Sequence, residues 1–214
     1  MKSLFRSKAP LAIASLAAAL VAGGCSMLEP KAERYVAPPV GSTWTQAQRN
    51  TGSYGTGTAQ VPFKRGVRTW EGKSLGALET PQQVTVVTAD GGWAAILSPD
   101  DKPIVSYDPP IGFDFPLVVG KTWTKSYRMT VIAKNQVIPF DATYKVEAYE
   151  DVTVPAGTFK AFKISSSTNT GSEDTYWFAP ELGLFVKQSL RRTDKSGYGP
   201  GTREVELVSQ SIKK

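Results

Sequence analysis

Polar and apolar residues alternate along much of the chain after its first forty residues. Between residues 122 and 131 the even-numbered positions are all polar, and the odd-numbered positions are apolar except for Lys125. This period of two predicts a β-strand with one buried face and one wet face. The same alternation recurs within residues 184–191 and 204–207. No stretch after residue 24 shows the 3.6-residue stripe of an amphipathic helix.

Turn-forming residues separate these stretches at short intervals. Glycine supplies a positive φ, proline fixes φ, and Asp or Asn hydrogen-bonds to its own turn. The turn segments are Asp90-Gly91-Gly92, Ser98-Pro99-Asp100-Asp101, Asp108-Pro109-Pro110, Pro155-Ala156-Gly157, Asn169-Thr170-Gly171 and residues 197–201. Short strands with such frequent turns predict an all-β fold, an antiparallel meander that forms a barrel-like body or a sandwich.

Two segments of the first half recur in the second half. Val40-Gly41-Ser42-Thr43-Trp44-Thr45 returns as Val119-Gly120-Lys121-Thr122-Trp123-Thr124, and Val61-Pro62-Phe63 returns as Ile138-Pro139-Phe140. These echoes predict two tandem repeats of about 75–80 residues, with halves at about 40–115 and 116–214. Shared strand and turn preferences are the alternative explanation for so few identities.

The N-terminal residues have the features of a secretion signal. Lys2, Arg6 and Lys8 precede an apolar run, residues 11–22, that only Ser15 interrupts. A transmembrane helix needs about 20 apolar residues, so this shorter run predicts a signal peptide over residues 1–24.

The end of that run, Leu20-Val21-Ala22-Gly23-Gly24-Cys25, resembles the lipobox of bacterial lipoproteins. The resemblance implies cleavage before Cys25 and lipid on its sulfur, which would anchor the protein to a membrane. Cys25 is the only cysteine, so no internal disulfide can form. The residue after it is Ser26 rather than the aspartate that retains enterobacterial lipoproteins at the inner membrane. We therefore expect an outer-membrane location facing the periplasm. The alternative is an ordinary signal peptide with a chance cysteine.

The remaining chain divides into a tether and a domain. Residues 25–39 mix charges with Pro30, Pro38 and Pro39, which predicts a lipidated N-terminus and extended tether ahead of a β domain over 40–214. Three of the 25 basic side chains lie in residues 1–24, which leaves 22 against 19 acidic ones. So mild a balance argues against nucleic acid as a partner. The expected partners are the membrane, through Cys25, and an envelope protein.

Three segments of the second half resemble a group of β-rich bacterial envelope proteins for which no activity is established. They are Phe115-Pro116-Leu117-Val118-Val119-Gly120-Lys121-Thr122-Trp123, Val152-Thr153-Val154-Pro155-Ala156-Gly157-Thr158-Phe159 and the segment Tyr176 to Lys187. The resemblance implies an exported antiparallel β domain and supplies no catalytic residues. Turns between strands are the structural explanation of the second and third segments.

The residue types present restrict the chemistry. The chain has no histidine, which excludes Ser-His-Asp systems, Cys-His systems and imidazole metal sites. A carboxylate pair, a Ser-Lys dyad or an oxygen-ligated cation remains, but the acidic pairs Asp100-Asp101, Glu150-Asp151 and Glu173-Asp174 have the pattern of solvated turn or strand residues. We expect no catalytic residues, no metal and no cofactor, and hence a protein that is not an enzyme.

Aromatic and basic residues suggest two contact surfaces. Trp44 and Trp123 are expected in the core, whereas Trp93, beside two glycines, is the candidate for an exposed indole. Lys187, Arg191 and Arg192 form a local basic cluster that could meet anionic headgroups, with a solvated outer face as the alternative.

We therefore expect a non-enzymatic adaptor or accessory subunit of an envelope process. The alternative function is a binding module for a hydrophobic or glycan ligand, because a barrel lined by indoles would suit either class of molecule.

Overall fold

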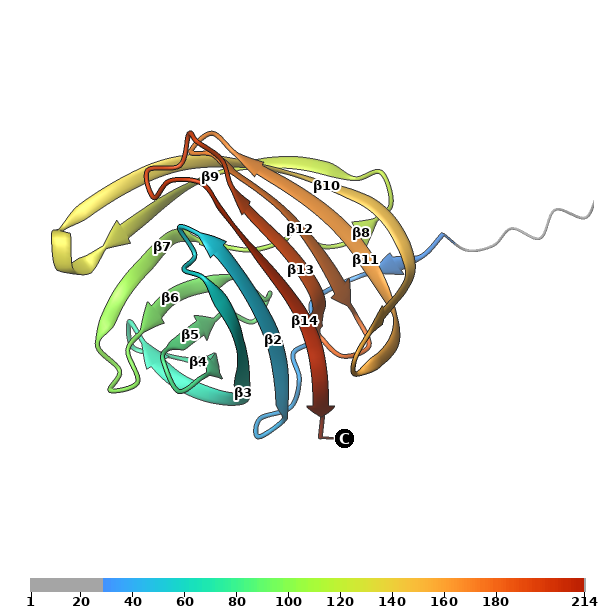
Figure 1. The fold of residues 1–214 in the computed structure, drawn as a ribbon. Helices are drawn as coiled ribbons and strands as arrows, with labels where there is room; N and C mark the ends of the chain where they lie inside the picture. The colour runs from blue at the N-terminus through green and yellow to red at the C-terminus, as the bar shows by residue number, and fades with distance from the viewer. Residues whose placement is uncertain (1–28, 214) are drawn as a thin grey trace, which may run out of the picture.

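The computed structural model describes residues 29–213, and β-strands account for nearly all of its regular structure (Figure 1). A single short 3₁₀ helix in this part of the chain, η1 (Ile132–Lys134), joins two strands. The strands are β1 (Lys31–Ala32), β2 (Thr43–Gly52), β3 (Gly57–Trp70), β4 (Lys73–Glu79), β5 (Val84–Val87), β6 (Trp93–Leu97), β7 (Pro103–Ile111), β8 (Leu117–Val118), β9 (Thr122–Val131), β10 (Gln136–Val154), β11 (Gly157–Thr168), β12 (Ser172–Ala179), β13 (Leu184–Arg192) and β14 (Gly201–Ser211).

All of these strands except β1 and β8, which form a separate two-stranded sheet, belong to one closed antiparallel barrel, which confirms the predicted fold class. Strands β2 to β7 follow one another as a meander, and strands β9 to β14 form a second one. Strand β14 pairs with β2, and β7 pairs with β9, so the two meanders close on each other. Closure leaves the sheet without a free edge for pairing with another chain.

The two meanders begin with the same local geometry. Gly41 and Gly120 both have a positive φ, +83° and +87°. The amide of Gly41 donates to the carbonyl of Arg65 at 2.7 Å, and the amide of Gly120 donates to the carbonyl of Val146 at 2.8 Å. Each glycine thus lies just before the first hairpin of its meander. Glycine suits this position because it adopts a positive φ without strain.

The tryptophans of the recurring segment also occupy matching places. Trp44 stacks on its cross-strand neighbour Phe63, with ring centroids 5.4 Å apart, and Trp123 stacks on Tyr144 at 4.9 Å. Both indoles therefore lie next to an aromatic ring at the start of a hairpin.

The second recurring segment does not match in this way. Pro62 lies opposite Thr45, the residue after the first tryptophan, whereas Pro139 lies opposite Arg128, five residues after the second. The tandem duplication therefore stays a prediction.

The chain joins the fold earlier than the sequence indicates. Strand β1 pairs with β8, and Ala32 is buried. The ring of Tyr35 lies 6.4 Å from that of Phe115 and 6.2 Å from that of Phe178. Among the described residues, paired strand structure thus starts at Lys31, ahead of the predicted domain boundary near Val40. Cys25 and the predicted signal peptide lie outside the described residues.

An aromatic cluster marks the interior of the barrel. The edge of Phe113, in the β7–β8 connection, meets rings from β9, β10, β12 and β13 at centroid distances of 5.6 to 6.2 Å. Rings from four strands of a closed barrel can converge on one residue only from the inner face. That face carries Trp123, Tyr144, Tyr176 and Phe185.

No helix between residues 29 and 213 is long and apolar enough to cross a membrane.

Candidate functional site

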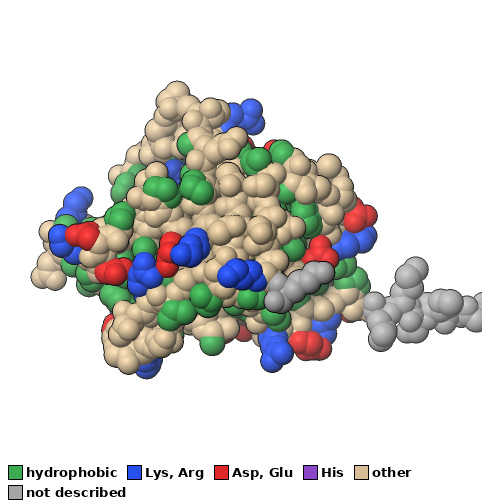
Figure 2. Space-filling view, turned by 90° about the horizontal axis from the view of Figure 1, so that it is seen from below, with side chains coloured by type: hydrophobic (Ala, Val, Ile, Leu, Met, Phe, Trp, Pro, Cys, Tyr) green, Lys and Arg blue, Asp and Glu red, His purple; other side chains and the backbone are tan. Residues whose placement is uncertain are grey.

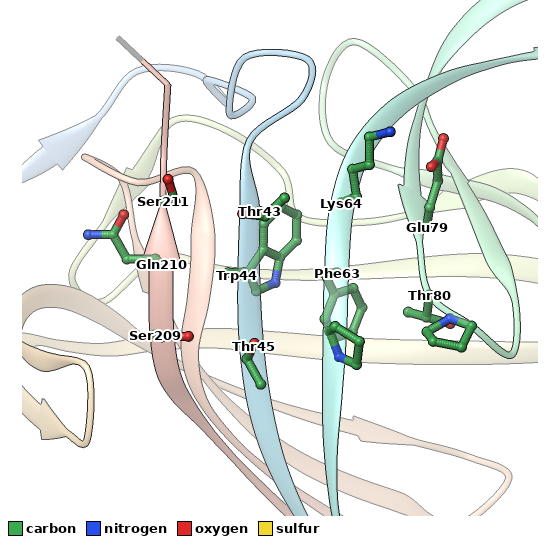
Figure 3. Close-up of a pocket in the computed structure, with 12 residues that line it drawn as sticks. Thr43, Trp44, Thr45, Phe63, Lys64, Glu79, Thr80, Ser209, Gln210 and Ser211 are labelled. Carbon is green, nitrogen blue, oxygen red and sulfur yellow. The ribbon is translucent and has the colours of Figure 1, made fainter.

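A hollow of about 670 Å³ opens at the end of the barrel where β2 begins and β14 ends (Figure 3). This basal hollow lies at the lower end in Figure 1, beside the C-terminus. Its apolar lining is Trp44, Pro62, Phe63 and Pro81, and its polar lining is Thr43, Thr45, Thr80, Ser209, Gln210 and Ser211, together with Lys64 and Glu79. Viewed from this end, the surface carries basic and acidic side chains interspersed, with no large area of one charge (Figure 2).

The aromatic floor of the basal hollow is a pair of stacked rings. Trp44 is only 4% exposed, and its indole lies parallel to the half-buried ring of Phe63, with 2° between their planes. Both residues face the same side of neighbouring strands, because Trp44 of β2 lies directly opposite Phe63 of β3. The buried indole therefore fixes the orientation of the phenyl ring that a ligand would touch.

The rim of the basal hollow is polar but almost neutral. Lys64 and Glu79 lie opposite each other on β3 and β4, and the other polar lining groups are hydroxyls and one amide. Glu79 is the only carboxylate among the lining residues. Hydrolysis of a glycoside by the usual mechanism needs two carboxyl groups across the bond. The arrangement thus suits holding a neutral polar ligand better than cleaving it.

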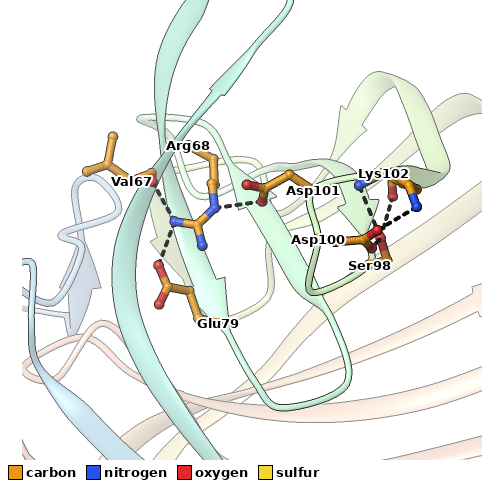
Figure 4. A network of polar contacts seen from close by, with 7 residues as sticks. All are labelled: Val67, Arg68, Glu79, Ser98, Asp100, Asp101 and Lys102. Atoms are coloured by element: carbon orange, nitrogen blue, oxygen red, sulfur yellow. Dashed lines mark hydrogen bonds and ion pairs between the residues drawn. The ribbon is translucent and has the colours of Figure 1, made fainter.

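Arg68 holds Glu79 in an ion pair and links it to a second acid, Asp101 (Figure 4). Arg68 donates to Glu79 at 2.8 Å through Nη1 and to Asp101 at 2.8 Å through Nε. The hydrogen bond to Asp101 raises the pKa of Arg68. Asp100 pairs separately with Lys102 at 2.6 Å. The two neighbouring acids of this turn therefore serve different partners and do not form a catalytic pair.

A half-buried carboxyl group lies on the inner face of the barrel. Asp174 of β12 accepts a hydrogen bond from the amide of Arg191 at 3.1 Å and one from the hydroxyl of Tyr176 at 3.2 Å. Burial raises the pKa of Asp174 to about 6, against the opposing effects of those hydrogen bonds and of Arg192. Burial also raises the pKa of Tyr176 well above its ordinary value.

Asp174 should make the stability of the fold depend on pH. The folded protein holds this proton to a higher pH than the unfolded chain does, so its contribution is present below about pH 4 and is lost as pH rises through about 6. Because one pKa unit corresponds to about 1.4 kcal/mol, the loss should be about 3 kcal/mol. Urea unfolding of the wild type and of Asp174→Asn across this range should show the loss only in the wild type.

The matched control for this measurement is Glu173→Gln. Glu173 precedes Asp174 in the same strand, but its side chain is 53% exposed and pairs with Arg191 on the outer face. Because Glu173 makes only the smallest contribution to the raised pKa of Asp174, the control should keep most of the pH dependence of the wild type. Equal pH dependence in Asp174→Asn and the wild type would contradict the assignment.

The structure separates the residues of the predicted basic cluster. Lys187 lies on the outer face, 3.1 Å from Glu206 and over the ring of Trp177, and Arg191 pairs with Glu173 on the same face. Arg192 points to the other face, because neighbouring strand residues alternate. The three side chains therefore do not form one patch, and their proposed role as contacts stays a prediction.

Trp93 is half-buried in β6, between β5 and β7, and is not the exposed aromatic side chain that the sequence indicates. Its cross-strand partners are Val87 and Ile111. Among the large hydrophobic side chains that the structure describes, the exposed aromatic one is Tyr198, at 62%. Tyr198 lies in the β13–β14 loop, where sequence pattern gives no burial signal.

Within residues 29–213 no three His, Cys, Asp or Glu side chains are grouped closely enough to hold a metal ion.

Three solved structures resemble the chain at low sequence identity. A candidate exported protein of Bacteroides fragilis with a YmcC-like fold is 12% identical, with a TM-score of 0.45 over 84% of this chain and 100% of its own. A candidate lipoprotein of Parabacteroides distasonis is 11% identical, with a TM-score of 0.42 over 84% of this chain and 99% of its own. The hypothetical lipoprotein YmcC of Escherichia coli is 10% identical, with a TM-score of 0.35 over 80% of this chain and 85% of its own.

Sequence comparisons give two further results. No curated protein sequence matches the chain. The DUF3108-like family matches residues 123–197, from β9 to the β13–β14 loop. This all-β chain is therefore similar to the DUF3108-like family over most of its second meander.

Proposed function

We propose that this chain is a lipid-anchored, non-enzymatic accessory protein of the bacterial outer membrane that faces the periplasm and holds a glycan in its basal hollow. The anchor and the location rest on the segment Leu20 to Cys25 and on Ser26. The non-enzymatic role is supported by the lack of histidine and by the single carboxylate in the hollow's lining.

The observation that favours a glycan is the pairing of an aromatic floor with a neutral, hydroxyl-rich rim. Sugars present apolar C–H faces and many hydroxyl groups, so they pack on aromatic rings and exchange hydrogen bonds with small polar side chains. Phe63 provides the ring face, and Gln210 together with the neighbouring threonines and serines provides donors and acceptors. An adaptor that docks only a protein would not need this combination.

The test is binding of soluble envelope oligosaccharides to the full-length lipoprotein in detergent, followed by calorimetry and tryptophan fluorescence. Phe63→Leu keeps an apolar side chain but removes the ring, so it should weaken binding. An aromatic contact contributes about 0.5–1.5 kcal/mol and each tenfold change corresponds to about 1.4 kcal/mol, so the expected range is about twofold to tenfold, with tenfold as its upper limit.

The matched control is Phe140→Leu. Phe140 is also half-buried and stacks on Tyr127 at 5.3 Å, but it lines a different hollow of about 340 Å³. This variant should bind as the wild type does. Binding lost in Phe140→Leu alone would move the site to that hollow. A stoichiometric protein partner crosslinked in cells without any bound glycan would instead favour the adaptor function.

A further inference from the structure

Two arginines enclose a tyrosine at the end of the barrel opposite the basal hollow. The guanidinium carbon of Arg192 lies 3.9 Å from the ring centroid of Tyr54 and 4.7 Å from that of Tyr198. The guanidinium carbon of Arg203 lies 4.8 Å from the ring centroid of Tyr54. We call Arg192, Arg203, Tyr54 and Tyr198 the arginine–tyrosine cluster. It lies at the upper end in Figure 1, where β2 ends and β14 begins.

The pairing of strands brings the two arginines together. Arg203 of β14 lies opposite Leu190 of β13, and Arg192 is two residues further along β13. Residues two apart on a strand share a face, so the two guanidinium groups are diagonal neighbours. The β2–β3 and β13–β14 loops meet above them, because the amide of Ser53 donates to the carbonyl of Pro200 at 2.9 Å.

Uncharged groups hold both guanidinium groups in place. Nη1 of Arg192 donates to the carbonyl of Ser53 at 3.1 Å, and Nε of Arg203 donates to the side-chain oxygen of Asn50 at 2.8 Å. The terminal nitrogens of Arg203 make no hydrogen bond to any described residue. Donors of the guanidinium fork thus remain available to a ligand.

The cluster carries positive charge without a paired carboxylate. Within residues 29–213 neither arginine has a carboxylate oxygen within 4.0 Å, whereas Arg68, Arg128 and Arg191 each do. Asp174 interacts electrostatically with Arg192, but its carboxyl group accepts hydrogen bonds from Tyr176 and from a backbone amide instead. Two like charges beside one ring repel each other, and an anion between them would remove the repulsion.

We propose that Arg192 and Arg203 form an anion site that takes a phosphate or carboxylate group of an envelope ligand. Guanidinium groups bind such groups through paired, charge-assisted hydrogen bonds, and stacking on Tyr54 holds their planes in advance. The site is separate from the basal hollow, since Asn50 and Thr43 lie at opposite ends of β2. It therefore goes beyond the proposed glycan function.

The experiment titrates the full-length, ¹⁵N-labelled lipoprotein in neutral detergent with three probes. These are inorganic phosphate, glucuronate and short-chain phosphatidylglycerol, and the arginine Nε–H signals report binding. Tightest binding of phosphatidylglycerol would assign the anion to a lipid headgroup, and tightest binding of glucuronate would assign it to an acidic glycan. Either result supports the site.

Variants with opposite expected effects make the test specific. Arg203→Gln should weaken binding at least tenfold, and Asp174→Asn should strengthen it severalfold because it removes the nearby negative charge. Arg128→Gln, an exposed arginine paired with Asp108, should bind as the wild type does. If Arg203→Gln fails to fold, Arg203→Lys keeps the charge and removes the fork. Equal affinity in all variants, or no binding of any probe, would overturn the proposal.

Discussion

Replacing Cys25 with serine should move the protein from the membrane fraction to the soluble fraction almost completely. The sulfur of Cys25 is the predicted attachment point of the lipid, and serine lacks it. Each buried CH₂ contributes about 0.8 kcal/mol, so the loss of two or three acyl chains removes far more energy than any surface contact could replace. Fractionation of cells, with mass spectrometry of the N-terminal peptide, measures both the location and the acyl mass.

A second variant controls for the route of export. Ser26→Asp keeps the lipid but introduces the residue that the resembling enterobacterial proteins use for retention, so it should shift the protein from the outer to the inner membrane. A Cys25→Ser protein that is cleaved and still sediments with membranes would contradict the lipid anchor. It would point instead to attachment through the barrel itself.

Replacing Phe162 with alanine should lower the free energy of unfolding by about 3–5 kcal/mol. Phe162 of β11 is 1% exposed, and its ring lies 4.6 Å from that of Tyr149. Truncation leaves a cavity in the hydrophobic cluster that also contains Tyr144 and Phe178, and the surrounding strands can relax only in part. Urea unfolding at constant pH, followed by tryptophan fluorescence, measures the change.

The control for this truncation is Lys160→Ala in the same strand. The Lys160 side chain is 55% exposed, and it pairs with the equally exposed Asp151. Exposed ion pairs contribute about 0–1 kcal/mol, so this change should have little effect. A similar loss of unfolding free energy in both variants would contradict the prediction. It would show that any substitution in β11 destabilises the fold, whether or not the side chain is buried.

The local structure was largely predictable from sequence. Strand β9 has the bounds that its alternation predicts, Thr122 to Val131, because a half-buried strand needs polar residues on one side only. The turn predicted at Asp90-Gly91-Gly92 joins β5 to β6, and Gly91 there has a φ of +87°. These features depend on neighbours within a few residues.

Features that depend on distant pairing were not predictable. Arg65 has the setting of an exposed residue in a polar strand, yet it is 7% exposed, and its Nη1 has no hydrogen-bond partner in the described part of the chain. Alternation alone predicts that Arg191 and Arg192 point to opposite faces of β13. The meeting of Arg192 with Arg203 and Tyr54 depends on the register between β13 and β14 and on the loop that follows β2. A single sequence carries no local signal for that register.

The pairing of β14 with β2 delays closure of the barrel until late in synthesis. During synthesis from the N-terminus, β2 is made early, and one side of it has no partner until β14 follows. Contacts between strands so far apart form slowly. A chain that still lacks β14 therefore cannot close its barrel, and it stays open until its last long strand has been made.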